Sequence, residues 1–361
     1  MATESPSPLP PATSARLTTR VIGIDAIRIL ATLAVIFLHA KPFMSAHDYG
    51  ATPYSVLRDV IVQFSRFAVP FFFIAAGYFL RRRLTSAPES ASLAWLYLRR
   101  IGMLYLIWAA LYLLFPPDWM RLLLEGHLRP FYWHLANAFM ALTRNPLVFL
   151  FKSTSVHLWF LPALIFAVSL LALTVRYRAS QFFLPLAGGL YVLGLLADAY
   201  SKTPLGLSVN SHLVLGLCYA PLFVGLGWRL ATRSTPRLST ALLFILGGFA
   251  LQFAEASWLS RLYGVPLISS AYLIGTVPFG LGFMLLGLTL PTWGSGRVLT
   301  RIGSMTLGIY LIHLWVKHLL LPLDQVFGGV MWELGFPLLI FAVSLGFAMW
   351  LSGTRLRSIV V

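Results

Sequence analysis

Long apolar runs separated by short polar connections constrain the fold of this chain more than any other feature. A helix that crosses a bilayer needs about 20 mainly apolar residues, and ten segments of roughly this kind follow one another in the sequence. Because 58% of the 361 residues are hydrophobic and only 11% are charged, an ordinary soluble domain is excluded. The sequence predicts an all-α polytopic membrane protein with spans near residues 22–40, 60–80, 101–116, 157–175, 181–198, 212–230, 240–257, 265–290, 302–320 and 331–351.

The positive charges fall mainly on one side of these spans. With the N-terminus inside, the inner connections hold sixteen basic and two acidic residues, and the outer ones hold nine basic and eight acidic residues. This asymmetry follows the positive-inside rule, and ten spans return the C-terminus to the cytoplasm. The formal net charge of +16 therefore reflects topology, so we expect the lipid bilayer, and no nucleic acid, among the partners.

The ends of the chain differ from its middle. Residues 1–19 are rich in Pro, Ser, Thr and Ala, which predicts a disordered cytoplasmic tail without a secretory signal. We expect the membrane domain to cover residues 20–354 and a short cytoplasmic C-terminus to cover residues 355–361. The single cysteine, Cys218, provides no disulfide framework.

The first span carries three ionisable residues, which are costly inside a membrane and are seldom kept without a role. Asp25 precedes Arg28 by one helical turn and can pair with it. Arg28 and His39 are eleven residues apart, so they share a helix face with a rise of about 16.5 Å between them. A simpler interpretation is a snorkelling Asp–Arg pair at one interface and an interfacial histidine at the other.

Five arginines flank the connection between the second and third spans. Basic residues beside spans usually fix topology. Five of them at one cytoplasmic connection also suit the binding of a phosphate-bearing ligand. They are Arg81, Arg82, Arg83, Arg99 and Arg100.

Further polar side chains lie toward the outer ends of other spans. Arg66 is near the outer end of the second span, and His157 and Trp159 open the fourth. Tyr310 and His313 share a face of the ninth span. A position at the membrane rim explains His157 and Trp159, taken alone, better than a catalytic role does. Helix packing and a site role explain Tyr310 and His313 equally well, because intramembrane histidines are scarce.

One outer connection is unusually long. Residues 117–156 are too polar to span twice. Within them, Tyr132 to Phe151 is amphipathic, so this part either lies in the membrane interface or folds back onto the protein.

The chemistry available to such a chain is limited. Metal-ligand, glycine-loop and nucleophile-elbow motifs do not occur, so we expect no metal. Asp25 is the one carboxylate placed securely inside a span. A histidine that can act as a base near neutral pH remains, with an Asp–Arg pair below it and arginines at the cytoplasmic mouth. This set suits the transfer of a group from a phosphorylated cytoplasmic donor. A transporter of a glycan precursor or small metabolite is the alternative, although no internal repeat supports it.

Four segments resemble those of the membrane-bound acyltransferase-3 family. The first span reads RVIGIDAIRILATLAVIFLHA and contains the family's hallmark, an arginine and a histidine with ten residues between them, here Arg28 and His39, with Asp25 shortly before. The second span contains VPFFFIAAGYFL, in which Ala76 replaces the family's usual serine. HLWFLPALI and IGSMTLGIYLIHLWV follow in the expected order, so the resemblance covers nearly the whole chain from Arg20.

The resemblance implies a stand-alone integral-membrane O-acyltransferase without an SGNH-type domain, in a bacterial inner or plasma membrane. It implies acetyl-CoA as co-substrate, no permanently bound cofactor, and a carbohydrate or lipid-linked glycan as acceptor. His39 would then be the catalytic base or acyl carrier, supported by Arg28 and Asp25. The family's arginine pair before the third span is matched only at Arg100, because Tyr97 occupies the first position. A catalytically inactive family member is the other possibility.

The five arginines are accordingly expected to bind acyl-CoA. The remaining polar residues are expected at the acceptor site or channel. These are Arg66, His157, Trp159, Tyr310 and His313.

Overall fold

The computed structural model describes residues 21–44, 52–85, 90–126, 128–293 and 296–359. Within these ranges the chain forms helices and turns and no β-strand, which confirms the predicted all-α class. The α-helices are α1 (Ile22–Ala40), α2 (Thr52–Ser65), α3 (Ala68–Thr85), α4 (Ser90–Leu114), α5 (Trp119–Leu124), α6 (Leu128–Arg144), α7 (Pro146–Lys152), α8 (Phe160–Arg176), α9 (Phe183–Ala197), α10 (Ser211–Val214), α11 (Ala220–Leu230), α12 (Leu238–Tyr263), α13 (Thr276–Thr289), α14 (Arg297–Leu320) and α15 (Val330–Ser352). Shorter turns of 3₁₀- or π-helix are η1 (Ser180–Phe182), η2 (Leu215–Tyr219), η3 (Leu321–Gln325) and η4 (Arg355–Ile359). The tail predicted for residues 1–19 lies outside the described residues.

Apolar helices account for every predicted span. In the described part of the chain, eight helices or joined helices are long and apolar enough to cross a membrane, and α8 and α13 are shorter apolar helices. Each of the ten predicted runs overlaps one of these ten. The number of crossings and the side on which each terminus lies stay predictions.

The second and eighth predicted spans differ from the structure in detail. The second is interrupted at Arg66 and Phe67, between α2 and α3, where Pro70 has no N–H with which to bond the carbonyl of Arg66. The prediction of a helix over 265–290 was wrong in its first part, because helix α13 begins only at Thr276. Helix α12 ends at Tyr263. The next residue, Gly264, has a φ of 63°, and Pro266 follows, so the chain turns here before α13.

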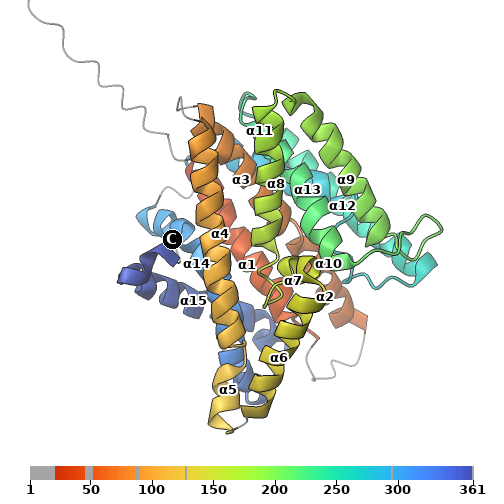
Figure 1. The fold of residues 1–361 in the computed structure, drawn as a ribbon. Coiled ribbons are helices and arrows are strands. Elements are labelled where there is room, and N and C mark those ends of the chain that lie inside the picture. Colours follow the sequence, from red (N-terminus) through yellow and green to blue (C-terminus); the bar gives the residue numbers. More distant parts are fainter. Residues whose placement is uncertain (1–20, 45–51, 86–89, 127, 294–295, 360–361) are drawn as a thin grey trace, which may run out of the picture.

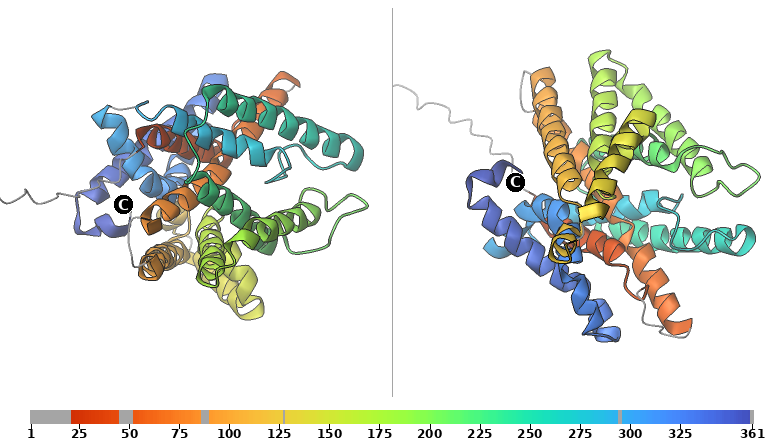
Figure 2. Two further views of the ribbon diagram at one scale, coloured as in Figure 1. Left: turned by 90° about the horizontal axis from the view of Figure 1, so that it is seen from above. Right: turned by 60° about the horizontal axis from the view of Figure 1, so that its bottom comes forward.

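Helix α1 lies at the centre of the bundle. It packs against α2, α3, α13, α14 and α15, and α3 packs in turn against α11 and α13 (Figure 1; Figure 2 shows the bundle from above). Glycines permit the closest approach between helices. A Cβ atom on Gly77 of α3 would lie 2.0 Å from the carbonyl oxygen of Val224, and one on Gly227 of α11 would lie 1.9 Å from that of Ile74.

The long connection 117–156 forms α5, α6 and α7, and its last helix folds back onto the protein, which is one of the two predicted arrangements. Helices α5 and α6 project beyond the end of α4 (Figure 1), and α6 exposes aromatic side chains such as Tyr132 and Phe139. Helix α7 folds back onto the bundle. There Phe151 is buried, and the Tyr105 hydroxyl of α4 donates to the carbonyl of Leu150 at 2.8 Å.

Candidate active site

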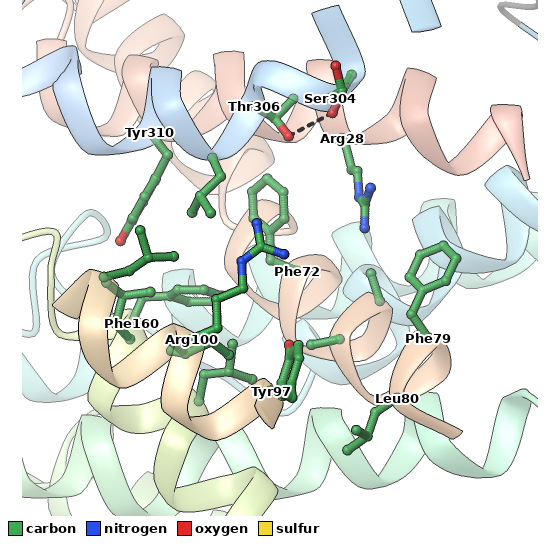
Figure 3. Close-up of a pocket in the computed structure, with 18 of the residues that line it drawn as sticks. Arg28, Phe72, Phe79, Leu80, Tyr97, Arg100, Phe160, Ser304, Thr306 and Tyr310 are labelled. Carbon is green, nitrogen blue, oxygen red and sulfur yellow. Dashed lines mark hydrogen bonds between the residues drawn. The ribbon is translucent and has the colours of Figure 1, made fainter. Parts of the chain in front are cut away.

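A cavity of about 530 Å³ lies between α1, α3, α4, α8 and α14 (Figure 3). At one end its lining is charged. Most of the remaining lining is apolar and includes Ala76, at the position where the sequence departs from the family pattern. At the other end Val35, Phe160 and Tyr310 line it. The charged residues of the lining are Asp25, Arg28, Arg82, Arg83 and Arg100. This volume lies in the range typical of small-molecule sites.

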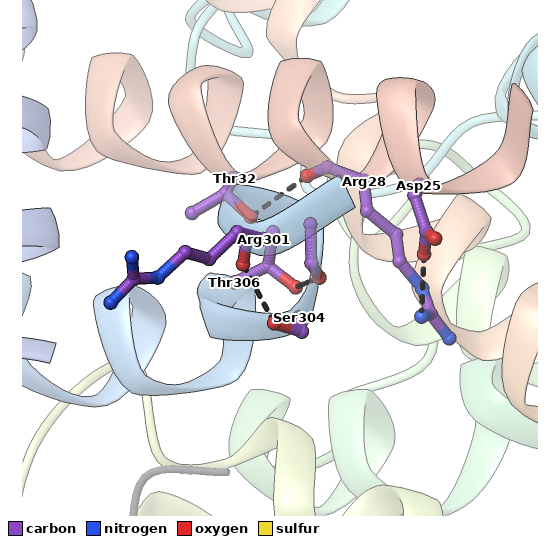
Figure 4. Close-up of polar contacts among 7 residues, drawn as sticks. Asp25, Arg28, Thr32, Arg301, Ser304 and Thr306 are labelled. Atoms are coloured by element: carbon purple, nitrogen blue, oxygen red, sulfur yellow. Dashed lines mark hydrogen bonds and ion pairs between the residues drawn. The ribbon is translucent and has the colours of Figure 1, made fainter. Parts of the chain in front are cut away.

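The predicted Asp–Arg pair forms at the charged end. Arg28 Nη1 lies 3.2 Å from Asp25 Oδ1 (Figure 4), and the Asp25 side chain is buried. The Arg28 guanidinium also lies 5.0 Å from the ring centroid of Phe79 on α3. Thr32, one turn further along α1, donates its hydroxyl to the carbonyl of Arg28 at 2.8 Å. The contacts with Asp25 and Phe79 hold the guanidinium beside the cavity, toward which Arg100 points from α4 (Figure 3).

Helix geometry places some of the five arginines expected to bind acyl-CoA on the cavity and turns the others away from it. Arg82, Arg83 and Arg100 line the cavity, whereas Arg81 and Arg99 do not. The Arg81 guanidinium lies over the ring of Trp228 on α11, 4.9 Å from its centroid. Successive residues of a helix point about 100° apart, which explains why neighbours in sequence face different surroundings.

Three histidines that are far apart in the sequence meet beyond the other end of the cavity. His39 comes from the last turn of α1, His157 from the turn before α8, and His313 from α14. The ring centroids of His39 and His313, and of His157 and His313, are 5.1 Å apart, and those of His39 and His157 are 6.4 Å apart. His157 and His313 are buried, and His39 is partly exposed. We call these three residues the histidine cluster.

Hydrogen bonds fix two of the three rings. His313 Nδ1 lies 2.5 Å from the carbonyl oxygen of Tyr310, so this nitrogen carries the proton and donates it. His157 Nδ1 lies 3.1 Å from Ser155 Oγ. Nε2 of both His157 and His313 is buried and has no hydrogen-bond partner among the residues that the structure describes. Ser155 was missed by sequence reasoning, since a hydroxyl two residues before a histidine is not a recognisable signal.

Tyr310 joins the cavity to the histidine cluster. Its side chain lines the cavity, and its ring centroid lies 5.3 Å from that of His157 and 5.9 Å from that of His313. Its hydroxyl donates to the carbonyl of His157. The cavity, whose other end holds four arginines, therefore leads toward three imidazoles.

Arg66 and Trp159 lie outside the cavity lining. Arg66 Nη2 donates to the carbonyl of Ile268 at 2.5 Å, beside the break between α2 and α3. The Trp159 ring packs between those of Phe73 and Tyr272, at centroid distances of 6.2 and 6.4 Å. The structure thus brings His157, Tyr310 and His313 to His39, but it gives Arg66 and Trp159 packing and hydrogen-bonding surroundings of their own.

Two buried carboxylates were not assigned from the sequence. Glu255 of α12 accepts hydrogen bonds from the Tyr200 hydroxyl at 2.7 Å and from the backbone N–H of Gly275 at 3.2 Å, and so holds the start of α13. Burial, with the nearby Glu255, raises the pKa of Tyr200, which keeps it a donor. Glu333 Oε2 accepts from the N–H of Phe43 at 2.7 Å, just after α1. Both carboxylates accept hydrogen bonds from backbone N–H groups, and such bonds leave no pattern in the sequence. The sequence indicated only that each carboxylate lies near the outer end of a span.

No group of His, Cys, Asp or Glu side chains in the described ranges has the arrangement that a metal ion requires.

Comparisons with known proteins bear on the whole of this bundle. A family model described as an acyltransferase domain matches residues 21–353. An amino-acid racemase of Enterococcus faecalis is 29% identical over 315 residues, which cover 81% of this chain and 40% of that protein. A serine/alanine racemase of Enterococcus gallinarum is 27% identical over 304 residues, with the same shares. The chain spans about two fifths of the length of these curated relatives. No solved structure matches it.

The family match includes the cavity, the Asp25–Arg28 pair and the histidine cluster. It agrees with the four segments recognised in the sequence, and the helices have the apolar character of an integral membrane protein. The chain belongs to the acyltransferase-3 family of membrane acyltransferases.

Proposed function

We propose that this membrane acyltransferase moves an acetyl group from cytoplasmic acetyl-CoA to a hydroxyl of a cell-envelope glycan or related acceptor. One observation carries the proposal: a cavity with an arginine-rich end leads toward Tyr310 and the histidine cluster. The phosphates of the donor would thus bind at one end of the cavity, and its acetyl group would approach the imidazoles at the other end. As a multi-span protein with positively charged inner connections, the enzyme would lie in a bacterial inner or plasma membrane.

The arginine-rich end suits the phosphates of CoA. Arg82, Arg83 and Arg100 line it from two helices, and guanidinium groups bind phosphate through paired N–H donors. Arg28 lies on the same lining and is held by Asp25. We infer that it helps to bind the negatively charged donor at this end of the cavity.

His39 lies about 16.5 Å further along α1, on the face that carries Arg28. It acts either as a base that takes the acceptor's proton or as a nucleophile that first accepts the acetyl group. Both routes end with an ester bond to the acceptor oxygen, a broken carbon–sulfur bond and free CoA.

The racemase activity in the names of the two relatives belongs to proteins more than twice as long as the matched region. It contributes nothing to this proposal.

The first test uses the purified protein in nanodiscs with acetyl-CoA, and follows free CoA. We expect slow release by the wild-type protein and none by His39→Ala, which should still insert into the membrane. CoA release by His39→Ala at the wild-type rate would reject the role of His39. Failure of the wild-type protein to bind acetyl-CoA, with flux of a solute instead, would favour a transporter.

The acceptor is sought with radiolabelled acetyl-CoA added to inside-out membrane vesicles, which carry the cell's own envelope glycans. Label should appear in a glycan or glycolipid fraction only when the active protein is present. Unchanged labelling in vesicles from a deletion strain would indicate an inactive family member.

A further inference from the structure

His313 is the residue of the histidine cluster whose protonation is best defined by its surroundings. It is fully buried, and its Nδ1 donates to the Tyr310 carbonyl one turn earlier on α14. A neutral imidazole with its proton on Nδ1 has a lone pair on Nε2. Here Nε2 is buried and has no hydrogen-bond partner within the described ranges of the chain. This is the arrangement of a general base whose orientation is fixed by a second group.

His157 offers the complementary group. Its Nε2 is also buried and has no hydrogen-bond partner in the described part of the chain, and its ring lies 5.1 Å from that of His313. When the Ser155 hydroxyl donates to Nδ1, the ring proton is on Nε2, which then acts as a donor. Buried polar atoms in proteins are nearly always hydrogen-bonded, so these two nitrogens point to a ligand that both accepts and donates a hydrogen bond. A hydroxyl group has this property.

We propose that the acceptor hydroxyl binds between His157 and His313, that His313 Nε2 takes its proton, and that His39 carries the acetyl group. This assignment rests on the proposed function and gives each residue of the histidine cluster a separate role. His39 is the member of the histidine cluster that shares a helix face with Arg28, and its ring lies 5.1 Å from His313. It can therefore face the donor on one side and the base on the other.

The two half-reactions balance. In the first, a ring nitrogen of His39 bonds to the thioester carbonyl carbon, the carbon–sulfur bond breaks, and CoA leaves as the thiol with the imidazole N–H proton. In the second, the acceptor gives its proton to His313 Nε2 as its oxygen bonds to the acetyl carbon. The carbon–nitrogen bond to His39 breaks, and the proton passes from His313 to the His39 ring. Both histidines end neutral.

The decisive variant is His313→Asn. An asparagine amide can replace Nδ1 as the donor to the Tyr310 carbonyl, but it removes Nε2. With radiolabelled acetyl-CoA and purified protein in nanodiscs, we expect the variant to release CoA once per molecule and to retain label on His39. In inside-out vesicles, we expect label transfer to the glycan fraction to fall by about a hundredfold or more, the usual effect of losing a general base. His318→Asn, five residues further along the same helix, is the matched control and should change neither step.

A pH profile separates a base from a structural role. The wild-type rate of transfer from His39 should fall as the pH decreases and His313 becomes protonated, and the residual rate of His313→Asn should lack this dependence. Ser155→Ala provides a second variant. It removes the hydroxyl that fixes the His157 ring, so we expect a smaller loss of transfer, roughly tenfold, with CoA release intact.

Several results would overturn the assignment. One is transfer by His313→Asn at the wild-type rate. Another is loss of the labelled His39 in a His313→Asn protein that remains folded by size-exclusion chromatography, since His313 would then act in the donor step. Rapid-quench experiments in which wild-type protein transfers acetyl without any labelled intermediate would reject His39 as the carrier. Wild-type protein that consumes no acetyl-CoA would reject the proposed function itself.

Discussion

Neighbouring residues of this chain have different surroundings because a helix turns them to different sides. Arg99 and Arg100 are adjacent on α4, yet only Arg100 lines the cavity. Arg81 and Arg82 differ in the same way on α3, where Arg81 lies against Trp228. Charge alone could not separate them in the sequence, because both members of each pair also satisfy the positive-inside rule.

We therefore expect Arg100→Ala to weaken the binding of acetyl-CoA and Arg99→Ala to leave this binding unchanged. Loss of one charge-assisted hydrogen bond to phosphate corresponds to roughly a tenfold rise in KM for acetyl-CoA, with kcat little changed. Steady-state CoA release by the two variants, prepared side by side, measures this. Equal effects of both substitutions would mean that the arginines act only on topology.

The sequence predicted some parts of the site and not others, for a physical reason. Asp25, Arg28 and His39 lie on one helix, so the spacing of residues along α1 fixes their relation. The histidine cluster depends on how α1, α8 and α14 pack, which no local pattern specifies. His157 and His313 were recognised as candidates, but their contact with His39 was not.

At the level of helices, close crossings depend on glycine. Gly227 of α11 lies against the backbone of Ile74 on α3, where a methyl group has no space. Helix α3 also lines the cavity, so this crossing places one wall of the candidate site. The loop before α13 shows the limit of sequence reasoning here, since an apolar composition over 265–275 conceals a turn begun by Gly264.

Gly227→Ala should destabilise the α3–α11 crossing by about 1–3 kcal/mol, as overpacking usually does. We expect a lower Tm for the detergent-solubilised variant. Gly188→Ala is the control, because a Cβ on Gly188 of α9 meets no atom of the described residues within 4 Å. A Tm that falls equally for both would contradict the assigned packing.

Glu333 connects α15 to the end of the helix that carries His39. Removing its bond to the N–H of Phe43 should let the last turn of α1 shift. For Glu333→Ala we expect kcat to fall about tenfold while KM for acetyl-CoA is unchanged, since small displacements of a reactive group are costly. Glu333→Gln keeps an acceptor oxygen and should recover most of the rate. If Glu333→Gln loses as much of kcat as Glu333→Ala does, the negative charge of Glu333 is required rather than its hydrogen bond.

For the whole molecule, the central prediction is the side of the membrane on which each connection lies. Ser234 stands between Arg233 and Arg237 in the turn from α11 to α12, and Leu205 lies in the turn after α9. Ten spans with the N-terminus inside place Ser234 in the cytoplasm and Leu205 outside.

Cys218 is the single cysteine, so a Cys218→Ser background allows labelling at chosen sites. In intact cells, a membrane-impermeant maleimide should react with Leu205→Cys and should reach Ser234→Cys only after permeabilisation. The reverse pattern would invert the topology. Reaction at both sites in intact cells would disprove the count of spans between them.

The cavity between the arginine-rich end and Tyr310 has an energetic consequence. In the proposed reaction, the bulky, highly charged CoA never leaves the cytoplasmic side, and only an uncharged two-carbon unit moves outward. Transfer is then electroneutral. The enzyme needs neither an ion gradient nor a rocking motion of two halves, because the free energy stored in the thioester drives modification on the far side of the membrane.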